Sequence, residues 1–292
     1  LQSIVERHEV LRTVIYEQNG TGYQKILNSK DWSLNESDGS DIKKDPDSLQ
    51  NYIQDIINKP FDLSADYMLR ADLIKTDEKE SILVVTMHHI SSDGWSLSVI
   101  VNELAELYKA FDENRTPDLL PMPIQYADFS VWQKKYLTSE VLDKKLEYWK
   151  SRLTGAEPLQ LPADFTRPAV QSIRGASYEF KISKELTDKL EQLSKQKGAT
   201  LYMTLLAAFN VLLYRYSGQK DISVGSPVAG RQQKEVEQLI GFFVNTLVLR
   251  NEIENSFTFL DLLDQVRTNT FEAFENQEVP FEKVVEATVK ER

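Results

Sequence analysis

The chain of 292 residues contains no cysteine. It therefore has no disulfide bond, no thiolate metal ligand and no cysteine nucleophile, and thioester chemistry would have to take its sulfur from a partner. Positive charge is also scarce, because 34 Lys and Arg residues face 45 Asp and Glu residues and give a formal net charge of −11. Proteins that bind nucleic acid need a basic face, so this balance argues against a nucleic-acid partner.

Long apolar runs and histidines are also few. The longest apolar run, residues 239–249, is shorter than a bilayer-spanning helix and carries polar residues, so we expect no membrane partner. No signal peptide is recognisable. Of the three histidines in the chain, His8 lies far in sequence from the adjacent pair His88 and His89. Neighbouring residues on a strand point to opposite faces, so we expect no metal site.

The chain begins at Leu1 rather than at a methionine and ends in a charged segment, so we expect a piece of a larger polypeptide. Its length is large for one hydrophobic core and predicts two similar lobes. We place the N-terminal lobe at residues 1–160 and the C-terminal lobe at residues 176–292. The linker at residues 161–175 has prolines and little periodicity.

Hydrophobic periodicity predicts a mixed sheet with helices in each lobe. The elements do not alternate strictly as βαβ units, so we expect an α+β sandwich rather than a doubly wound sheet. Residues 33–47 are polar and predict a surface loop. We predict strands at 12–17, 23–27, 67–75, 81–87, 176–182, 222–228 and 242–250, and helices at 1–9, 47–58, 97–111, 126–136, 141–153, 184–197, 201–216, 258–274 and 280–287.

The most informative stretch is Met87–Ser96, Met-His-His-Ile-Ser-Ser-Asp-Gly-Trp-Ser. A β-branched apolar strand precedes it, and a helix with Leu97, Ile100, Val101, Leu104, Leu107 and Tyr108 on one side follows it. We expect His88 and His89 to leave the strand end on opposite faces, one buried and structural and the other reactive. We favour His89 as the reactive histidine, able to accept a proton near neutral pH. The alternative is a satisfied structural histidine.

The residues that follow turn the chain into the helix. Asp93 could orient His89, cap the helix that begins near Trp95, or pair with an arginine, and the last two roles together are favoured over the first. Gly94 permits a sharp turn or the close approach of a substrate. The serines of the stretch lack a Gly-x-Ser-x-Gly elbow, so we do not expect a serine nucleophile.

A second cluster, Arg7–Thr13, lies at a predicted junction of helix and strand. Its two arginines, Arg7 and Arg12, either stay solvated, which is the usual state of surface charge, or one of them neutralises a buried carboxylate. Asp93 is the obvious candidate for that carboxylate. The spacing of the residues does not decide between these alternatives.

Together with these two segments, three others resemble condensation domains of non-ribosomal peptide synthetases, a branch of the chloramphenicol-acetyltransferase-like superfamily. Met87–Ser96 is similar to the His-His-x-x-x-Asp-Gly motif of that family, and Arg7–Thr13 to its Arg-His-Glu-x-Leu-Arg-Thr segment. Measured against the family, the chain resembles a domain truncated at both ends, and Asn276 stands where many relatives carry histidine. The other three similar segments are Tyr126–Gln133, Ile240–Thr246 and Gln277–Glu282.

The resemblance implies two acetyltransferase-like α/β sandwich lobes in a V-shaped pseudo-dimer, with a tunnel that meets His89. It implies that a donor acyl or peptidyl thioester and an acceptor aminoacyl thioester are joined by an amide bond. Both would be delivered on the phosphopantetheine arms of carrier proteins, and the domain itself would bind no cofactor. The implied partners are upstream and downstream peptidyl carrier proteins and an adjacent adenylation domain. The domain would be monomeric within a multidomain, cytoplasmic synthetase of secondary metabolites such as antibiotics.

The resemblance also implies a role for each site residue. The catalytic pair would be His89, which removes a proton from the attacking amine or only holds it, and Gly94, whose amide faces the developing oxyanion. The structural residues around them would be His88, Asp93, Arg7 and Arg12, with Asp93 paired to Arg12 by preference. The substrate tunnel would be lined by Trp95, Ser96 and Asn245, although Asn245 fits a structural amide at a strand end equally well.

The segments Arg7–Glu9 and Phe242–Leu247 resemble those of domains that join an L-configured donor to an L-configured acceptor. The intact His88-His89 pair differs from the Asp-rich motif of heterocyclising relatives, and Trp95–Ser98 differs from the pattern of epimerising relatives. Two other functions remain open from the sequence. One is a coenzyme A-dependent acyltransferase of the same superfamily, and the other is a non-catalytic fragment that docks carrier proteins.

Overall fold

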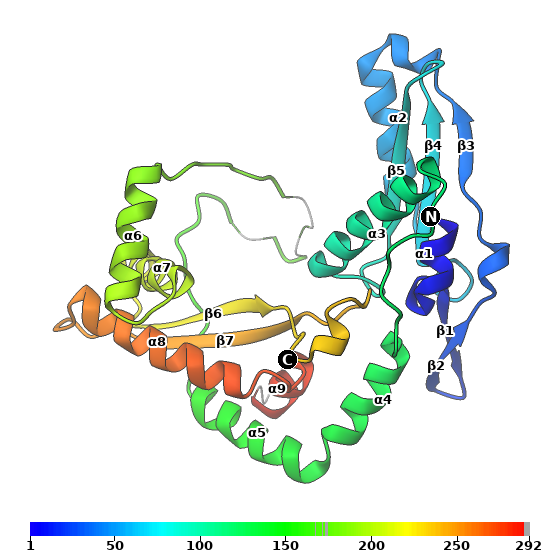
Figure 1. Ribbon diagram of the computed structural model, residues 1–292. Helices are drawn as coiled ribbons and strands as arrows, with labels where there is room; N and C mark the ends of the chain where they lie inside the picture. Colours follow the sequence, from blue (N-terminus) through cyan, green and yellow to red (C-terminus); the bar gives the residue numbers. More distant parts are fainter. Residues whose placement is uncertain (167, 171, 173–174, 289–292) are drawn as a thin grey trace. The chain divides into compact units, whose positions relative to one another are not determined.

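The computed structural model describes residues 1–166, 168–170, 172 and 175–288 (Figure 1). The chain forms two compact units, residues 1–136 with 229–244, and residues 137–228 with 245–292. Each unit contains both helices and strands, which confirms the α+β prediction.

These units divide the chain differently from the expected lobes 1–160 and 176–292. Helix α5 (Ser139–Leu153) belongs to the second unit because Trp149 is buried in its core, and residues 229–244 belong to the first. The lobe boundaries of the family stay a prediction. Four residues of the expected linker (167, 171, 173 and 174) and the last four residues of the expected C-terminal lobe lie outside the described residues.

The first unit is built on a three-stranded sheet in the order β3-β4-β5, with a separate hairpin β1-β2. Strands β4 and β5 pair antiparallel, with Leu69 opposite Met87, and β3 pairs with β4 in parallel. Its elements are α1 (Gln2–Arg7), η1 (Glu9–Arg12), β1 (Thr13–Gln18), β2 (Thr21–Ile26), η2 (Ser29–Asp31), β3 (Asn35–Asp38), η3 (Ile42–Lys44), α2 (Pro46–Asn58), β4 (Leu69–Lys75), β5 (Ser81–Met87), α3 (Gly94–Asp112), α4 (Tyr126–Tyr136) and η4 (Lys234–Val236).

Strand β3 lies where a polar surface loop was expected, so that expectation was wrong for four residues. Its sequence, Asn-Glu-Ser-Asp, has little strand propensity of its own. The strand forms because the free edge of β4 accepts it, from Asn35 opposite Asp72 to Asp38 opposite Lys75. An edge strand of this kind needs no apolar face, which explains why hydrophobic periodicity does not reveal it.

The buried face of α3 is rotated relative to the apolar face that the sequence predicted. Leu97, Val101 and Tyr108 are 54%, 56% and 74% exposed. The buried positions are Ser96, Val99, Ile100, Glu103 and Ala110. The helix therefore turns a buried serine and a buried glutamate toward the rest of its unit, and both take part in the site described below.

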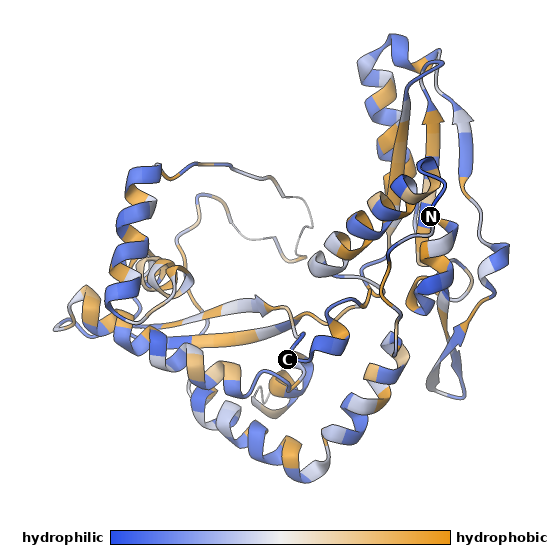
Figure 2. Cartoon of the chain, in the orientation of Figure 1, coloured by the Kyte–Doolittle hydropathy of each residue, from blue (hydrophilic) through white to orange (hydrophobic). Residues whose placement is uncertain are grey.

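The second unit packs its helices on the antiparallel pair β6-β7, and apolar residues follow these two strands (Figure 2). A strand expected at residues 176–182 is not formed, and Tyr178 and Phe180 are 89% and 75% exposed, because no described strand pairs with this segment. The elements of the unit are α5 (Ser139–Leu153), α6 (Lys184–Gln196), α7 (Leu201–Ser217), β6 (Asp221–Val228), β7 (Asn245–Glu252), α8 (Phe259–Glu275) and α9 (Phe281–Thr288).

The segment between β6 and β7 leaves the second unit and packs in the first as residues 229–244. Gly230 allows this path, because its φ of +65° is one that only glycine adopts freely and a Cβ there would overlap the carbonyl oxygen of Phe243. Strand β7 consequently begins at Asn245, later than the expected strand start at residue 242.

We expect Gly230→Ala to lower the free energy of unfolding of the first unit by at least about 3 kcal/mol, because positive φ and steric overlap act together. Gly20→Ala is the matched control, since Gly20 also has a positive φ but open space around it. It should cost only about 1 kcal/mol. Urea unfolding measures both, and equal losses would contradict the steric explanation.

Candidate active site

The turn after β5 carries both adjacent histidines. The strand ends at Met87, and the His88 amide donates to the carbonyl of Met68 at 3.0 Å. His88 is partly buried, its Nδ1 accepts from the Ile90 amide at 3.1 Å, and its ring meets the Phe61 ring edge-on at 5.6 Å. The contacts of His88 are therefore all structural.

His89 is exposed, and its two ring nitrogens have different surroundings. Nδ1 lies 2.5 Å from the carbonyl oxygen of Ser92, which fixes Nδ1 as the protonated, donating nitrogen. Within the described residues, no group hydrogen-bonds to Nε2. A ring with its proton on Nδ1 alone presents the lone pair of Nε2 for bonding, the arrangement that a proton acceptor or a hydrogen-bond acceptor for an amine requires.

Asp93 begins α3 with a reciprocal capping box. Its Oδ1 accepts from the Ser96 amide at 2.9 Å, and Ser96 Oγ in turn accepts from the Asp93 amide at 3.3 Å. Oδ2 of the same carboxylate accepts from the Phe243 amide at 3.1 Å. The side chain is almost fully buried, so these amides and one cation replace its water.

That cation is Arg231, whose Nη2 lies 3.1 Å from Asp93 Oδ1. Its Nη1 donates to the carbonyls of Val236 and Leu239 at 2.6 and 2.7 Å, and its guanidinium lies 4.0 Å from the centre of the Phe243 ring. Burial would raise the pKa of Asp93, but the Ser96 and Phe243 hydrogen bonds and the Arg231 charge outweigh it and hold that pKa below its ordinary value. Asp93 is therefore a buried, charged anchor.

The expected pairing of Asp93 with Arg12 is wrong. Arg12 donates to the carbonyls of Val5 and Leu27 at 3.2 and 2.7 Å, and its nearest carboxylate is that of Glu9 at 3.6 Å. The guanidinium of Arg12 is hydrogen-bonded to these nearby backbone carbonyls, so it does not pair with the carboxylate of Asp93.

Arg7 does neutralise a buried carboxylate, but that of Glu103. Arg7 Nε lies 2.8 Å from Glu103 Oε1, and the buried His8 places Nε2 at 2.9 Å from Oε2. Burial raises the pKa of Glu103, and the contacts with His8 and Arg7 lower it by more, so the net shift is downward. This cluster ties α1 and η1 to α3, the helix that starts at the motif.

Two residues expected in a substrate tunnel have different surroundings. Ser96 is fully buried, and its Oγ donates to Asp93 and accepts from the Gly241 amide at 3.1 Å, so its prediction as a tunnel residue is wrong. Trp95 is 47% exposed, with its indole donating to the Glu237 carbonyl at 2.9 Å. It stays a candidate for contact with substrate.

Gly94 is the first residue of α3, and a Cβ built on it meets nothing within 4 Å. The first amides of a helix have no acceptor within the helix and carry partial positive charge. An oxygen that approaches Gly94 can therefore be met by a backbone donor without steric hindrance.

Asn245, in the second unit, has the geometry of a structural amide at a strand end. Its Nδ2 donates to the carbonyls of Gln277 and Val279 at 2.8 and 2.7 Å, and its Oδ1 accepts from the Phe281 amide at 3.0 Å. Because these three bonds use both donors and the acceptor, the structural alternative is favoured over the tunnel.

Sequence reasoning missed Arg231, Glu103 and Phe242. Arg231 has no local signal, since its partner lies 138 residues away. Glu103 did have a local signal, because it occurs at helical spacing among the apolar residues of α3. A charge at such a position needs a buried partner. Phe242, whose ring lies 5.2 Å from that of His89, was part of a family-like segment and of an expected strand, but it was given no role in the site.

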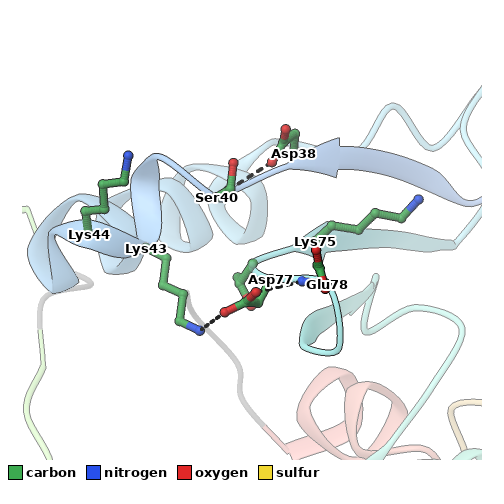
Figure 3. Close-up of a pocket in the computed structure, with 8 residues that line it drawn as sticks. Asp38, Ser40, Lys43, Lys44, Lys75, Asp77 and Glu78 are labelled. Atoms are coloured by element: carbon green, nitrogen blue, oxygen red, sulfur yellow. Dashed lines mark hydrogen bonds and ion pairs between the residues drawn. The ribbon is translucent and has the colours of Figure 1, made fainter.

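A separate hollow of about 690 Å³ lies at the other end of β5, between η3 and the β4-β5 turn (Figure 3). Its three lysines are already paired, Lys43 with Asp77 at 3.6 Å, Lys44 with Asp41 at 2.6 Å and Lys75 with Glu36 at 2.9 Å. Elsewhere in the described chain, no three His, Asp or Glu side chains are grouped to hold a metal ion, and no helix has the length and apolar character to cross a membrane. The candidate site is therefore the turn at His89.

A family model described as Condensation domain matches residues 1–292. The chain is 48% identical over its whole length to part of a linear gramicidin synthase of Brevibacillus parabrevis, and it spans only 4% of that protein. It is also 41% identical over its whole length to part of a chondramide synthase of Chondromyces crocatus, of which it spans 8%.

Two solved structures illustrate the likeness in fold. The X-domain from teicoplanin biosynthesis is 27% identical, with a TM-score of 0.87 over 98% of this chain and 64% of that one. A four-domain nonribosomal peptide synthetase bound to AMP and glycine is 23% identical, with a TM-score of 0.84 over 100% of this chain and 22% of that one, and this likeness shows the fold alone.

We expect Asp93→Asn to lower the free energy of unfolding of the first unit by about 3–5 kcal/mol, because it leaves the buried Arg231 without its counter-charge. Asp77→Asn is the matched control, since Asp77 is 63% exposed and its ion pair with Lys43 is worth at most about 1 kcal/mol. Urea denaturation measures both variants. Equal and small losses would show that the Asp93 charge is not an anchor.

The depressed pKa values of Asp93 and Glu103 also predict the direction of pH dependence. A carboxyl whose pKa is lower in the folded state stabilises the fold above its unfolded pKa, about 4, and loses this contribution as pH falls through the folded pKa. Unfolding free energies measured from pH 6 down to about pH 2 should therefore decline below about pH 4. Glu103→Gln should make the decline shallower, and an unchanged slope would contradict the assignment.

Proposed function

The chain belongs to the condensation-domain family, and we propose that it joins two carrier-bound thioesters by an amide bond within a larger non-ribosomal peptide synthetase. The acceptor's amine nitrogen attacks the donor's thioester carbonyl, the C–N bond forms, the C–S bond breaks, and the donor thiol leaves on its own carrier arm. The amino-acid sequences of the motifs support an L-configured donor and an L-configured acceptor.

The observation that carries this proposal is the state of His89. One ring nitrogen is bound to the Ser92 carbonyl, the other has no hydrogen-bond partner within the described residues, and the side chain is exposed at the end of β5. A neutral imidazole held in this way accepts a hydrogen bond from the attacking amine and takes its proton when the C–N bond forms. A general base of this type contributes about 10²–10⁴-fold in rate.

The start of α3 supplies the complementary charge. The tetrahedral intermediate carries a negative oxygen, and the Gly94 amide at the N-terminus of α3 is the proposed donor to it. An oxyanion donor acts at about 2.7–3.1 Å, so the proposal requires the oxygen to approach the Gly94 amide to this distance.

The absence of cysteine from the chain agrees with substrates that are bound to carrier proteins. The chain has no cysteine, so the thioesters must be attached elsewhere, and phosphopantetheine arms of peptidyl carrier proteins supply them without a cofactor bound to this domain. Carrier proteins on both sides and an adenylation domain that loads them are the proposed partners. Alignment of two such large substrates contributes up to roughly 7–11 kcal/mol to the barrier reduction.

We expect His89→Ala to lower the rate of dipeptidyl-thioester formation about 10²–10⁴-fold in the synthetase that contains this chain, because the amine loses its acceptor. Mass spectrometry of the downstream carrier gives the rate. Ile90→Ala is the control within the same turn and should keep turnover near the wild-type value. A His89→Ala variant with wild-type turnover would show that His89 takes no part in amide formation.

A further inference from the structure

The ring of His89 has a second neighbour besides the Ser92 carbonyl. The Phe242 ring meets it at 5.2 Å between centroids and 76° between planes, an edge-to-face arrangement. Such pairs are favourable because the positive edge of one ring faces the negative face of the other. The imidazole is therefore restrained both at Nδ1 and by the neighbouring ring of Phe242.

The exposure of Phe242 distinguishes it from a core residue. Its side chain is 40% exposed, whereas the adjacent Phe243 is 5% exposed and belongs to a buried cluster. A half-exposed ring contributes less than a buried one to folding through the hydrophobic effect. Among the described residues, the aromatic ring that pairs with Phe242 is that of His89.

The backbone on either side of Phe242 is fixed by the carboxylate network. The Phe243 amide donates to Asp93 Oδ2 at 3.1 Å, and the Gly241 amide donates to Ser96 Oγ at 3.1 Å. These bonds attach the Phe242 segment to the N-terminus of α3. The same network therefore determines where the ring of Phe242 stands relative to the turn that bears His89.

Tyr126 holds the same segment from α4. Its hydroxyl donates to the Phe242 carbonyl at 2.7 Å, and its ring covers Gly241 so closely that a Cβ there would overlap it. Burial and the nearby charge of Asp93 raise the pKa of Tyr126, which keeps the hydroxyl protonated and able to donate. The backbone of Phe242 thus has a fixed position from which its side chain reaches His89.

We propose that Phe242 is a positioning residue that keeps the His89 ring in the orientation presenting Nε2 to the reacting amine; this rests on the proposed function of His89. Rotation of the ring by half a turn would exchange the places of its nitrogen and carbon atoms and break the bond to Ser92. Phe242 opposes that rotation by occupying one side of the ring. Phe61 makes the same kind of contact with His88, at 5.6 Å and 78°, so the chain contains its own control.

The first test is kinetic and uses the synthetase with loaded carriers. Phe242→Leu keeps apolar volume but removes the ring, and we expect kcat to fall about 3- to 10-fold while KM for the acceptor carrier is unchanged. Phe242→Tyr keeps an aromatic ring at this position and should have a kcat close to that of the wild type. Tyr126→Phe removes only the hydroxyl that holds the Phe242 backbone and should give a smaller loss of the same kind. Phe111→Leu, at a residue 85% exposed in the same unit, is the surface control.

The second test does not depend on activity. Nitrogen NMR of the 292-residue chain, with three histidines to assign, reports which ring nitrogen of His89 carries the proton. We expect a single Nδ1-protonated form in the wild type and averaged nitrogen shifts in Phe242→Leu. Phe61→Leu should alter the His88 signals and leave those of His89 unchanged.

The two tests separate failure of this inference from failure of the proposed function. If Phe242→Leu has wild-type kcat and a single His89 tautomer, Phe242 does not position His89, and the inference is overturned. If the wild type forms no amide but its His89 tautomer still depends on Phe242, the positioning stands and the proposed reaction fails. An equal effect of Phe61→Leu on the His89 nitrogens would also overturn the inference.

Discussion

The buried ion pair between Asp93 and Arg231 is the interaction on which the site depends. One carboxylate caps α3, accepts the Phe243 amide and pairs with the guanidinium, while that guanidinium holds the carbonyls of Val236 and Leu239. Each charge is buried and is stable there only because the other is present, since loss of one partner leaves an uncompensated charge. The N-terminus of α3 and the segment 229–244 are therefore fixed together.

This arrangement separates structural charge from reactive groups. The ionised side chains near the motif, Asp93, Arg231 and Glu103, are engaged by partners within the first unit. What is left exposed at the turn is the imidazole of His89, held at Nδ1, and a helix N-terminus that begins with a glycine. A site with these groups is suited to align an amine with a carbonyl and to receive one proton, which is what amide formation from a thioester needs.

The sequence predicted the local features of this site and not its long-range contacts. The strand end at Met87, the helix start after Asp93 and the difference between the two histidines follow from periodicity and capping rules that act over a few residues. The partner of Asp93 could not be predicted in this way, because sequence spacing cannot select Arg231 from 34 basic residues. The family resemblance led to Arg12 instead. For the same reason Ser96 was placed in a tunnel, although it is buried among polar groups brought from distant segments.

The source of the acyl group tests the proposed reaction most directly. The same donor acyl group can be offered to the synthetase containing this chain either on the upstream carrier protein or as its coenzyme A thioester. Mass spectrometry then follows the new amide on the downstream carrier. We expect rapid amide formation from the loaded carriers and little from coenzyme A. Efficient transfer from coenzyme A to a free amine, with the loaded carriers unreactive, would contradict the assignment as a condensation centre.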